Sequence, residues 1–145
     1  MQLNLIKAIA NVQAEAPVIK VDAKNPAFQG RKYATIKQIM DTIKPLLNKN
    51  NLVFTSRFDF QNEQWGMLSS LIWCGPHGEM EKESAFFPME KIADPQQLGK
   101  LATYARRYNI TSLLNLCFED DDDDDDGNSF MAKKTPKTAP KPLNL

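Results

Sequence analysis

The chain has 145 residues, enough for one domain with a hydrophobic core. Its apolar runs are all shorter than the roughly 20 residues of a membrane helix, and its N-terminus lacks the apolar block and cleavage site of a signal peptide. We therefore expect a cytosolic protein without a membrane partner. Cys74 and Cys117 are too few and too far apart for a disulfide framework, so we expect them to be thiols in the core.

The net charge is zero, but the charges are unevenly distributed. Residues 1–118 carry 14 Lys and Arg against 10 Asp and Glu, and residues 119–126 are all acidic. Residues 127–145 carry four lysines and no acidic residue. This pattern predicts a mildly basic folded domain over residues 1–118, followed by a disordered tail over residues 119–145 with an acidic run and a Lys/Pro-rich end.

Helical periodicity predicts a first helix over residues 4–16, which Pro17 ends. Its apolar stripe comprises Leu5, Ile6, Ile9, Ala10, Val12 and Ala16. A loop follows, with room for a short edge strand. Thr35 and Gln38 form a capping-box pattern, which predicts a second helix over residues 36–48 with a kink or a last turn at Pro45.

Three strands are predicted next, over residues 52–60, 67–74 and 79–87, separated by turn sequences. In the first strand, four apolar residues alternate with Val53 and three polar residues, which predicts one buried face made of Leu52, Phe54, Phe58 and Phe60. The second strand is apolar enough to be central. The three strands should form an antiparallel meander.

A third helix should begin at Asp94, a helix-capping residue, with Pro95 at its first position. We expect it to end near Tyr108, with Asn109 as a left-handed break. Residues 110–117 would form a further short helix or extended segment. The predicted fold class is therefore α+β, with helices packed on the meander in the order two helices, three strands, two helices.

The third helix has two contrasting faces on a helical wheel. Leu98, Leu101, Ala105 and Tyr108 should face the sheet, while Lys100, Thr103, Arg106 and Arg107 form the polar side with Tyr104 at its boundary. Cations that contact phosphates and a flat ring that stacks on bases are typical of single-stranded DNA binding. The alternative is a solvated helix face, with Arg106 paired to a strand glutamate and Tyr104 at the core edge.

A second cluster of cations with a tyrosine precedes the second helix. It consists of Arg31, Lys32 and Tyr33, which we also predict to bind DNA. The alternative for Tyr33 is that it packs at the beginning of that helix. We hypothesise that both clusters line one groove that continues across subunits.

These residues carry a family resemblance. Gly99 followed by Thr103-Tyr104-Ala105-Arg106-Arg107-Tyr108 resembles the signature of the phage ERF (essential recombination function) single-strand annealing proteins. The resemblance covers about residues 1–127 and includes Arg31 to Thr35, Asp94 to Gln96 and the Asp-rich run. Lys100 and Leu101 stand where the family usually has small residues after the glycine.

The resemblance implies ATP-independent annealing of complementary single strands during phage homologous recombination, by an oligomeric ring or filament and without a cofactor. It implies a core related to Rad52, in which a helix packs across a hairpin or three-stranded meander. The expected partners are single-stranded DNA, the annealed duplex intermediate and other copies of the chain. A phage exonuclease or a host single-strand-binding protein would be a further partner in the host bacterial cytoplasm.

Other kinds of site fit the sequence less well. Asp122-x-Asp124-x-Asp126-Gly127 begins like a calcium loop, but Lys133 stands where the closing Glu is required. Cys74 and His77 with Cys117 are too sparse for zinc, and we find no phosphate-binding loop or nucleophile with a base. We therefore expect no metal, no catalytic residue and no enzyme. The rival functions are passive single-strand protection and an interaction protein that recruits partners through its tail.

Overall fold

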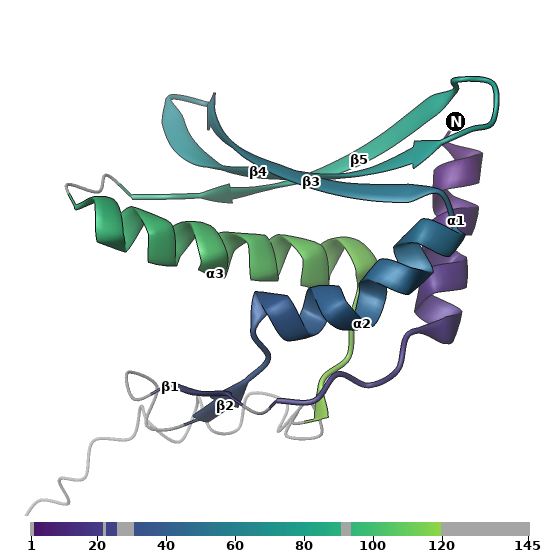
Figure 1. The fold of residues 1–145 in the computed structure, drawn as a ribbon. Helices are drawn as coiled ribbons and strands as arrows, with labels where there is room; N and C mark the ends of the chain where they lie inside the picture. The colour runs from purple at the N-terminus through teal and green to yellow at the C-terminus, as the bar shows by residue number, and fades with distance from the viewer. Residues whose placement is uncertain (1, 22, 26–30, 91–93, 120–145) are drawn as a thin grey trace, which may run out of the picture.

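The computed structural model describes residues 2–21, 23–25, 31–90 and 94–119, and only the backbone of residues 23–25, 31 and 32. The order of elements, shown in Figure 1, is α1 (Leu3–Glu15), β1 (Ala23–Asn25), β2 (Arg31–Tyr33), α2 (Ile36–Lys49), β3 (Leu52–Gln61), β4 (Gln64–Cys74), β5 (Met80–Pro88) and α3 (Pro95–Leu114). The predicted α+β class is confirmed. The predicted order is wrong in two places, because a β1–β2 hairpin precedes α2 and one long α3 replaces the last two helices. All but one residue of the predicted tail lies outside the described residues.

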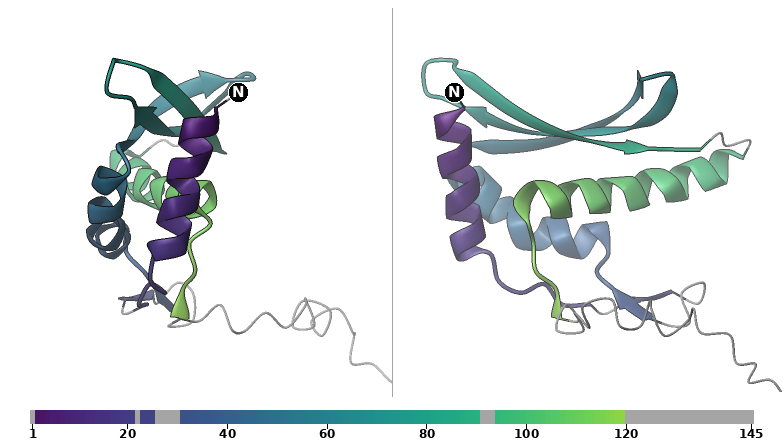
Figure 2. Two further views of the ribbon diagram at one scale, coloured as in Figure 1. Left: turned by 90° about the vertical axis from the view of Figure 1, so that its right-hand side faces the viewer. Right: turned by 180° about the vertical axis from the view of Figure 1, so that it is seen from behind.

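The three predicted strands form one antiparallel sheet with β4 in the middle, as expected. Asn62 and Glu63 connect β3 to β4 with φ angles of 49° and 63°, the left-handed backbone that a tight two-residue hairpin requires. The sheet bows toward α3 at its centre, and its two ends lift away (Figure 1). Figure 2 shows α1 crossing one of these ends, while α3 begins beneath the other.

Helix α3 continues through the predicted break. Asn109 is buried, and its Nδ2 donates hydrogen bonds of 3.0 Å to the Met67 carbonyl and 3.0 Å to Ser69 Oγ, both on β4. The left-handed residue is Asn115, with φ 51° and ψ 52°. Contacts with the sheet therefore determine the conformation of Asn109, and the local preference of asparagine for a helix end does not.

Two hydrophobic clusters hold the helices to the sheet. The larger one lies among α1, α2, the second half of α3 and the sheet; its fully buried large residues are Leu5, Val12, Ile39, Ile43, Leu71, Ile110 and Leu114. The smaller cluster comprises Met67, Met89 and Ala105, with Phe87 and Leu101 packed against it. The first half of α3 therefore has much less core beneath it than the second half.

Several residues predicted to be buried are exposed instead. They are Ile6 and Ala10 of α1, Phe58 and Phe60 of β3, Leu98 and Tyr108 of α3, and both cysteines, Cys74 and Cys117. The physical reason differs between elements. Helix α1 packs through one side only, and the β3–β4 end of the sheet lifts away from α3. Periodicity identified the apolar side chains of α1, β3 and α3, but the part of the chain that the structure describes leaves them exposed.

The predicted helix starts are confirmed. Gln38 N donates to Thr35 Oγ1 at 3.1 Å, and Thr35 N donates to Gln38 Oε1 at 2.9 Å, which completes the capping box of α2. Asp94 caps α3 by accepting a 2.9 Å hydrogen bond from Gln96 N. Helix α2 runs on past Pro45 to Lys49. In the part of the chain that the structure describes, no helix is both long and apolar enough to cross a membrane.

Candidate nucleic-acid interface

The two predicted clusters meet at Arg107. Its guanidinium carbon lies 4.7 Å from the centroid of the Tyr33 ring and 5.2 Å from that of Tyr104. The Tyr108 ring lies 5.8 Å away. These distances are those of cation–π contacts. Tyr33, Tyr104, Arg107 and Tyr108 are called the tyrosine–arginine surface below.

Local structure positions Tyr33 against α3. Tyr33 ends β2, where it pairs with Ala23 of β1, and Thr35 begins the capping box of α2 two residues later. The chain is thereby held on both sides of Tyr33, and its side chain is half-buried. The alternative prediction, that Tyr33 packs at the beginning of α2, is compatible with this position, but the ring also carries the Arg107 guanidinium.

The tyrosines of α3 form an aromatic group with Phe87 of β5. The Tyr104 and Tyr108 ring centroids are 4.5 Å apart, and each lies 5.8 Å from that of Phe87. The Tyr104 hydroxyl donates a 3.0 Å hydrogen bond to that of Tyr108. This bond, partial burial and the nearby Tyr108 raise the pKa of Tyr104 above the ordinary tyrosine value, against the opposing charge of Arg107. Tyr104 is therefore neutral at physiological pH.

Lys100 and Thr103 extend the same stripe of α3 toward its N-terminus, and both are exposed. Lys100 lines an open hollow of about 310 Å³ together with Gln97, Leu101 and Tyr104. The Thr103 hydroxyl donates to the Gly99 carbonyl at 3.1 Å. A Cβ added at Gly99 would meet no atom within 4 Å, so this glycine is not a close-packing position within the chain.

Arg106 stands apart from the other predicted contacts. It lies about 100° around the helix from Arg107, is half-buried, and its Nε is buried without a hydrogen-bond partner among the described residues. The predicted alternative, an ion pair with a strand glutamate, is not formed. The two ion pairs found among described residues join Lys37 to Asp41 and Lys49 to Glu15. The side chains of Arg31 and Lys32 lie outside the described residues.

A comparison with protein-family models matches residues 5–144 to the ERF superfamily. The chain belongs to the ERF superfamily. Comparisons with curated proteins and with solved structures found no match, so the likeness to Rad52 stays a prediction. ERF membership implies a function in recombination or annealing, and ERF proteins are annealing proteins rather than typical enzymes.

The ERF signature of this chain contributes three of the four residues of the tyrosine–arginine surface, all from α3. Sequence reasoning missed Phe87 altogether and assigned Tyr108 to the packed side, although Tyr108 is 48% exposed. The four-residue spacing of Tyr104 and Tyr108 was the available signal, because residues four apart are neighbours on a helix. No sequence pattern pointed to Phe87, which the fold brings from β5.

Among the described residues, no acidic side chain forms an ion pair with the tyrosine–arginine surface. Neither Arg107 nor Lys100 belongs to an ion pair with another described residue. Nor do three or more His, Cys, Asp or Glu side chains of the described ranges come together as candidate metal ligands. The arrangement offers cations, the exposed ring of Tyr108 and the half-buried rings of Tyr33 and Tyr104, which suit contacts to phosphates and stacking on bases.

Proposed function

We propose that this chain is an ATP-independent single-stranded DNA-binding and strand-annealing protein of homologous recombination that acts as an oligomeric ring or filament. The observation that supports this most strongly is the position of Arg107 across the rings of Tyr33 and Tyr104. One cation and three flat rings, from two separate sequence clusters, lie within cation–π distance of one another. We propose Lys100, Thr103 and Arg106 of α3 as further contacts of this surface, and we propose that Arg31 and Lys32 also bind DNA.

The chemistry of the tyrosine–arginine surface fits annealing. Stacking of a base on an aromatic side chain contributes about 1–3 kcal/mol and tolerates any sequence. Phosphate contacts likewise position a strand without reading its sequence. A strand held in this way keeps Watson–Crick edges free to pair with an incoming complement. The annealed duplex then leaves because its bases are no longer available for stacking on tyrosine.

The weakness of a single protomer is the reason for proposing an oligomer. Each phosphate neutralised on a single strand contributes a salt slope of only about −0.7 in log K against log [salt]. A few contacts per protomer therefore give weak binding that salt weakens further. Linking many such sites along one strand raises the overall affinity by avidity, without any new kind of contact.

A fluorescence annealing assay with two complementary oligonucleotides and no ATP tests this function. We expect the wild-type chain to accelerate pairing, and the double variant Arg106→Ala with Arg107→Ala to lose most of the acceleration while remaining folded. Non-complementary oligonucleotides serve as the control. Binding in a gel shift without accelerated pairing would instead indicate passive protection, and no binding even at low salt would indicate an interaction protein.

A further inference from the structure

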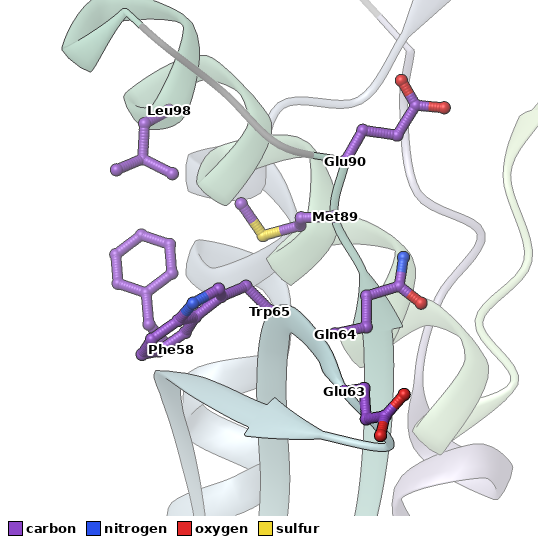
Figure 3. Close-up of a pocket in the computed structure, with 7 residues that line it drawn as sticks. All are labelled: Phe58, Glu63, Gln64, Trp65, Met89, Glu90 and Leu98. Atoms are coloured by element: carbon purple, nitrogen blue, oxygen red, sulfur yellow. The ribbon is translucent and has the colours of Figure 1, made fainter.

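A second exposed surface lies at the β3–β4 end of the sheet. It surrounds a cavity of about 660 Å³ between the hairpin and the first turn of α3 (Figure 3). Phe58, Trp65, Met89 and Leu98 gather on one side of it, and these four residues are called the apolar cup below. Phe58, Trp65 and Leu98 are exposed, whereas Met89 is buried. Trp65 is 62% exposed, although large aromatic side chains contribute most to stability when they are covered.

The border of the apolar cup is acidic. Glu63 and Glu90 line the cavity, with their carboxylates directed away from the apolar side chains, and the lining residues that the structure describes include no basic one. Glu63 also holds a left-handed backbone with φ 63°, which is costly for a residue other than Gly, Asn or Asp. The two glutamates would repel the phosphates of a nucleic acid. The cavity is better suited to an apolar partner that carries a positive charge.

Helix α1 carries a surface of that description. Its inner side buries Leu5, Ala8 and Val12, yet its outer side is also apolar. The outer stripe comprises Leu3 (47% exposed), Ile6 (58% exposed), Ala10 and Ala14. Lys7 lies at the edge of this stripe, one turn from Leu3. A helix that is apolar on both sides is typical of one that is covered on both sides.

The apolar cup and the outer stripe of α1 lie at opposite ends of the molecule, as the views in Figures 1 and 2 agree. One copy therefore cannot join its own two surfaces, whereas successive copies can. Contacts between two different surfaces of identical chains generate a closed ring or an open filament.

We propose that the apolar cup of one copy receives Leu3 and Ile6 of the next copy, with Lys7 close to the acidic border. The biological purpose of this interface depends on the proposed function, because annealing needs many protomers on one strand. The interface itself is supported by the two exposed apolar surfaces, by Glu63 and Glu90 beside one and Lys7 beside the other, and by their positions at opposite ends of the molecule.

Light scattering on the full chain tests the interface. We expect a multimeric wild type and a monomeric mass for both Trp65→Glu and Ile6→Glu. The decisive sample is the mixture of the two variants: Ile6→Glu keeps an intact cup and Trp65→Glu keeps an intact α1, so together they should form a dimer and grow no further. Val18→Glu, at a residue as exposed as Ile6 (58%) but outside both surfaces, should keep the wild-type mass.

Circular dichroism confirms that each variant is folded, and Leu98→Glu repeats the cup test if Trp65→Glu is not. A wild-type mass for either single variant, or a monomeric mixture, would overturn the interface. So would a monomeric wild type. A tryptophan fluorescence shift with a peptide of residues 133–145, seen in the wild type and not in Trp65→Glu, would then show that the cup holds the tail. Unchanged masses with normal annealing would overturn the interface alone; the expected masses without single-strand binding would overturn the proposed function alone.

Discussion

The tyrosine–arginine surface and the apolar cup share one helix but differ in chemistry. Arg107 offers a cation without an acidic partner among the described residues, whereas Leu98 belongs to an apolar hollow bordered by glutamates. Nine residues separate them, about 13 Å along the helix axis. Under the two proposals, contacts with an anionic strand and contacts with an apolar partner occupy separate parts of α3.

The shape of the sheet explains why both surfaces exist. The centre of the sheet presses on α3, where Asn109 and Ala105 are buried, and the β3–β4 end lifts away from its first turns. At the other end, α1 fills the corresponding space. Buried residues such as Ala105 and Asn109 therefore anchor one side of the second half of α3, while its first turns have little core beneath them.

Removing the hydrogen bonds that hold Asn109 of α3 to β4 should disrupt both surfaces and cause the largest loss of stability. Asn109→Asp places a carboxylate, which accepts hydrogen bonds only, against the Met67 carbonyl that now receives one. We expect a loss of about 2–4 kcal/mol in the free energy of unfolding, measured by urea denaturation. Asn48→Asp, on the exposed side of α2, should change it by no more than about 0.5 kcal/mol. A similarly small change for Asn109→Asp would contradict the anchoring role.

Disabling the apolar cup should affect DNA binding only through avidity. We expect Trp65→Glu to weaken binding to a long single strand by about 100-fold and to leave binding to an oligonucleotide that spans one protomer unchanged. Fluorescence anisotropy with the two lengths measures the contrast. Equal losses for long and short strands would show that the cup itself contacts DNA.

Changing one hydroxyl sharpens the description of the tyrosine–arginine surface. Tyr108→Phe removes the acceptor of the Tyr104 hydrogen bond, so the pKa of Tyr104 should fall back toward its ordinary value of about 10. The folded-state pKa of Tyr104 is raised, so its hydrogen bond with Tyr108 stabilises the fold at neutral pH. This contribution to the free energy of unfolding is lost as the pH rises through the raised pKa. Ultraviolet titration measures the pKa. An unchanged pKa of Tyr104 in this variant would show that the hydrogen bond to Tyr108 is not the main cause of the raised pKa.

The smallest effect is expected at Gly99, which lies between the two surfaces. Because an added Cβ meets no atom within 4 Å and the position is inside a helix, Gly99→Ala should raise the free energy of unfolding by about 0.5–1 kcal/mol. Thermal or urea unfolding measures this change. If the variant is more stable but anneals poorly, the open space at Gly99 is occupied by DNA or by another copy.

Local signals in the sequence were sufficient for much of the fold. Thr35, Gln38 and Asp94 marked helix starts because caps depend on neighbours in the chain. Alternating apolar and polar residues, separated by short turn sequences, likewise predicted the three-stranded meander from neighbours in the chain. Asn109 was misassigned because its partners, Met67 and Ser69, come from a strand some 40 residues away.

The site was predictable in part. Tyr33, Tyr104 and Arg107 were identified by residue type, and the fold brings them together. Burial was the least predictable property, because periodicity shows which side chains are apolar and not whether this chain covers them. Ile6 and Phe58 were placed in the core for that reason, and their exposure is what led to the proposed interface.

The salt dependence of single-strand binding tests the central claim most directly. Arg107→Ala should weaken binding about tenfold per site, which is about 1.4 kcal/mol, and reduce the slope of log K against log [salt] by about 0.7. Arg57→Ala is the control, because Arg57 carries the same charge and is exposed, whereas Arg107 is half-buried, and because Arg57 lies on the sheet, on β3. It should leave both affinity and slope unchanged. An Arg107→Ala variant with the wild-type slope, or equal losses for the two variants, would contradict the assignment of the tyrosine–arginine surface to DNA.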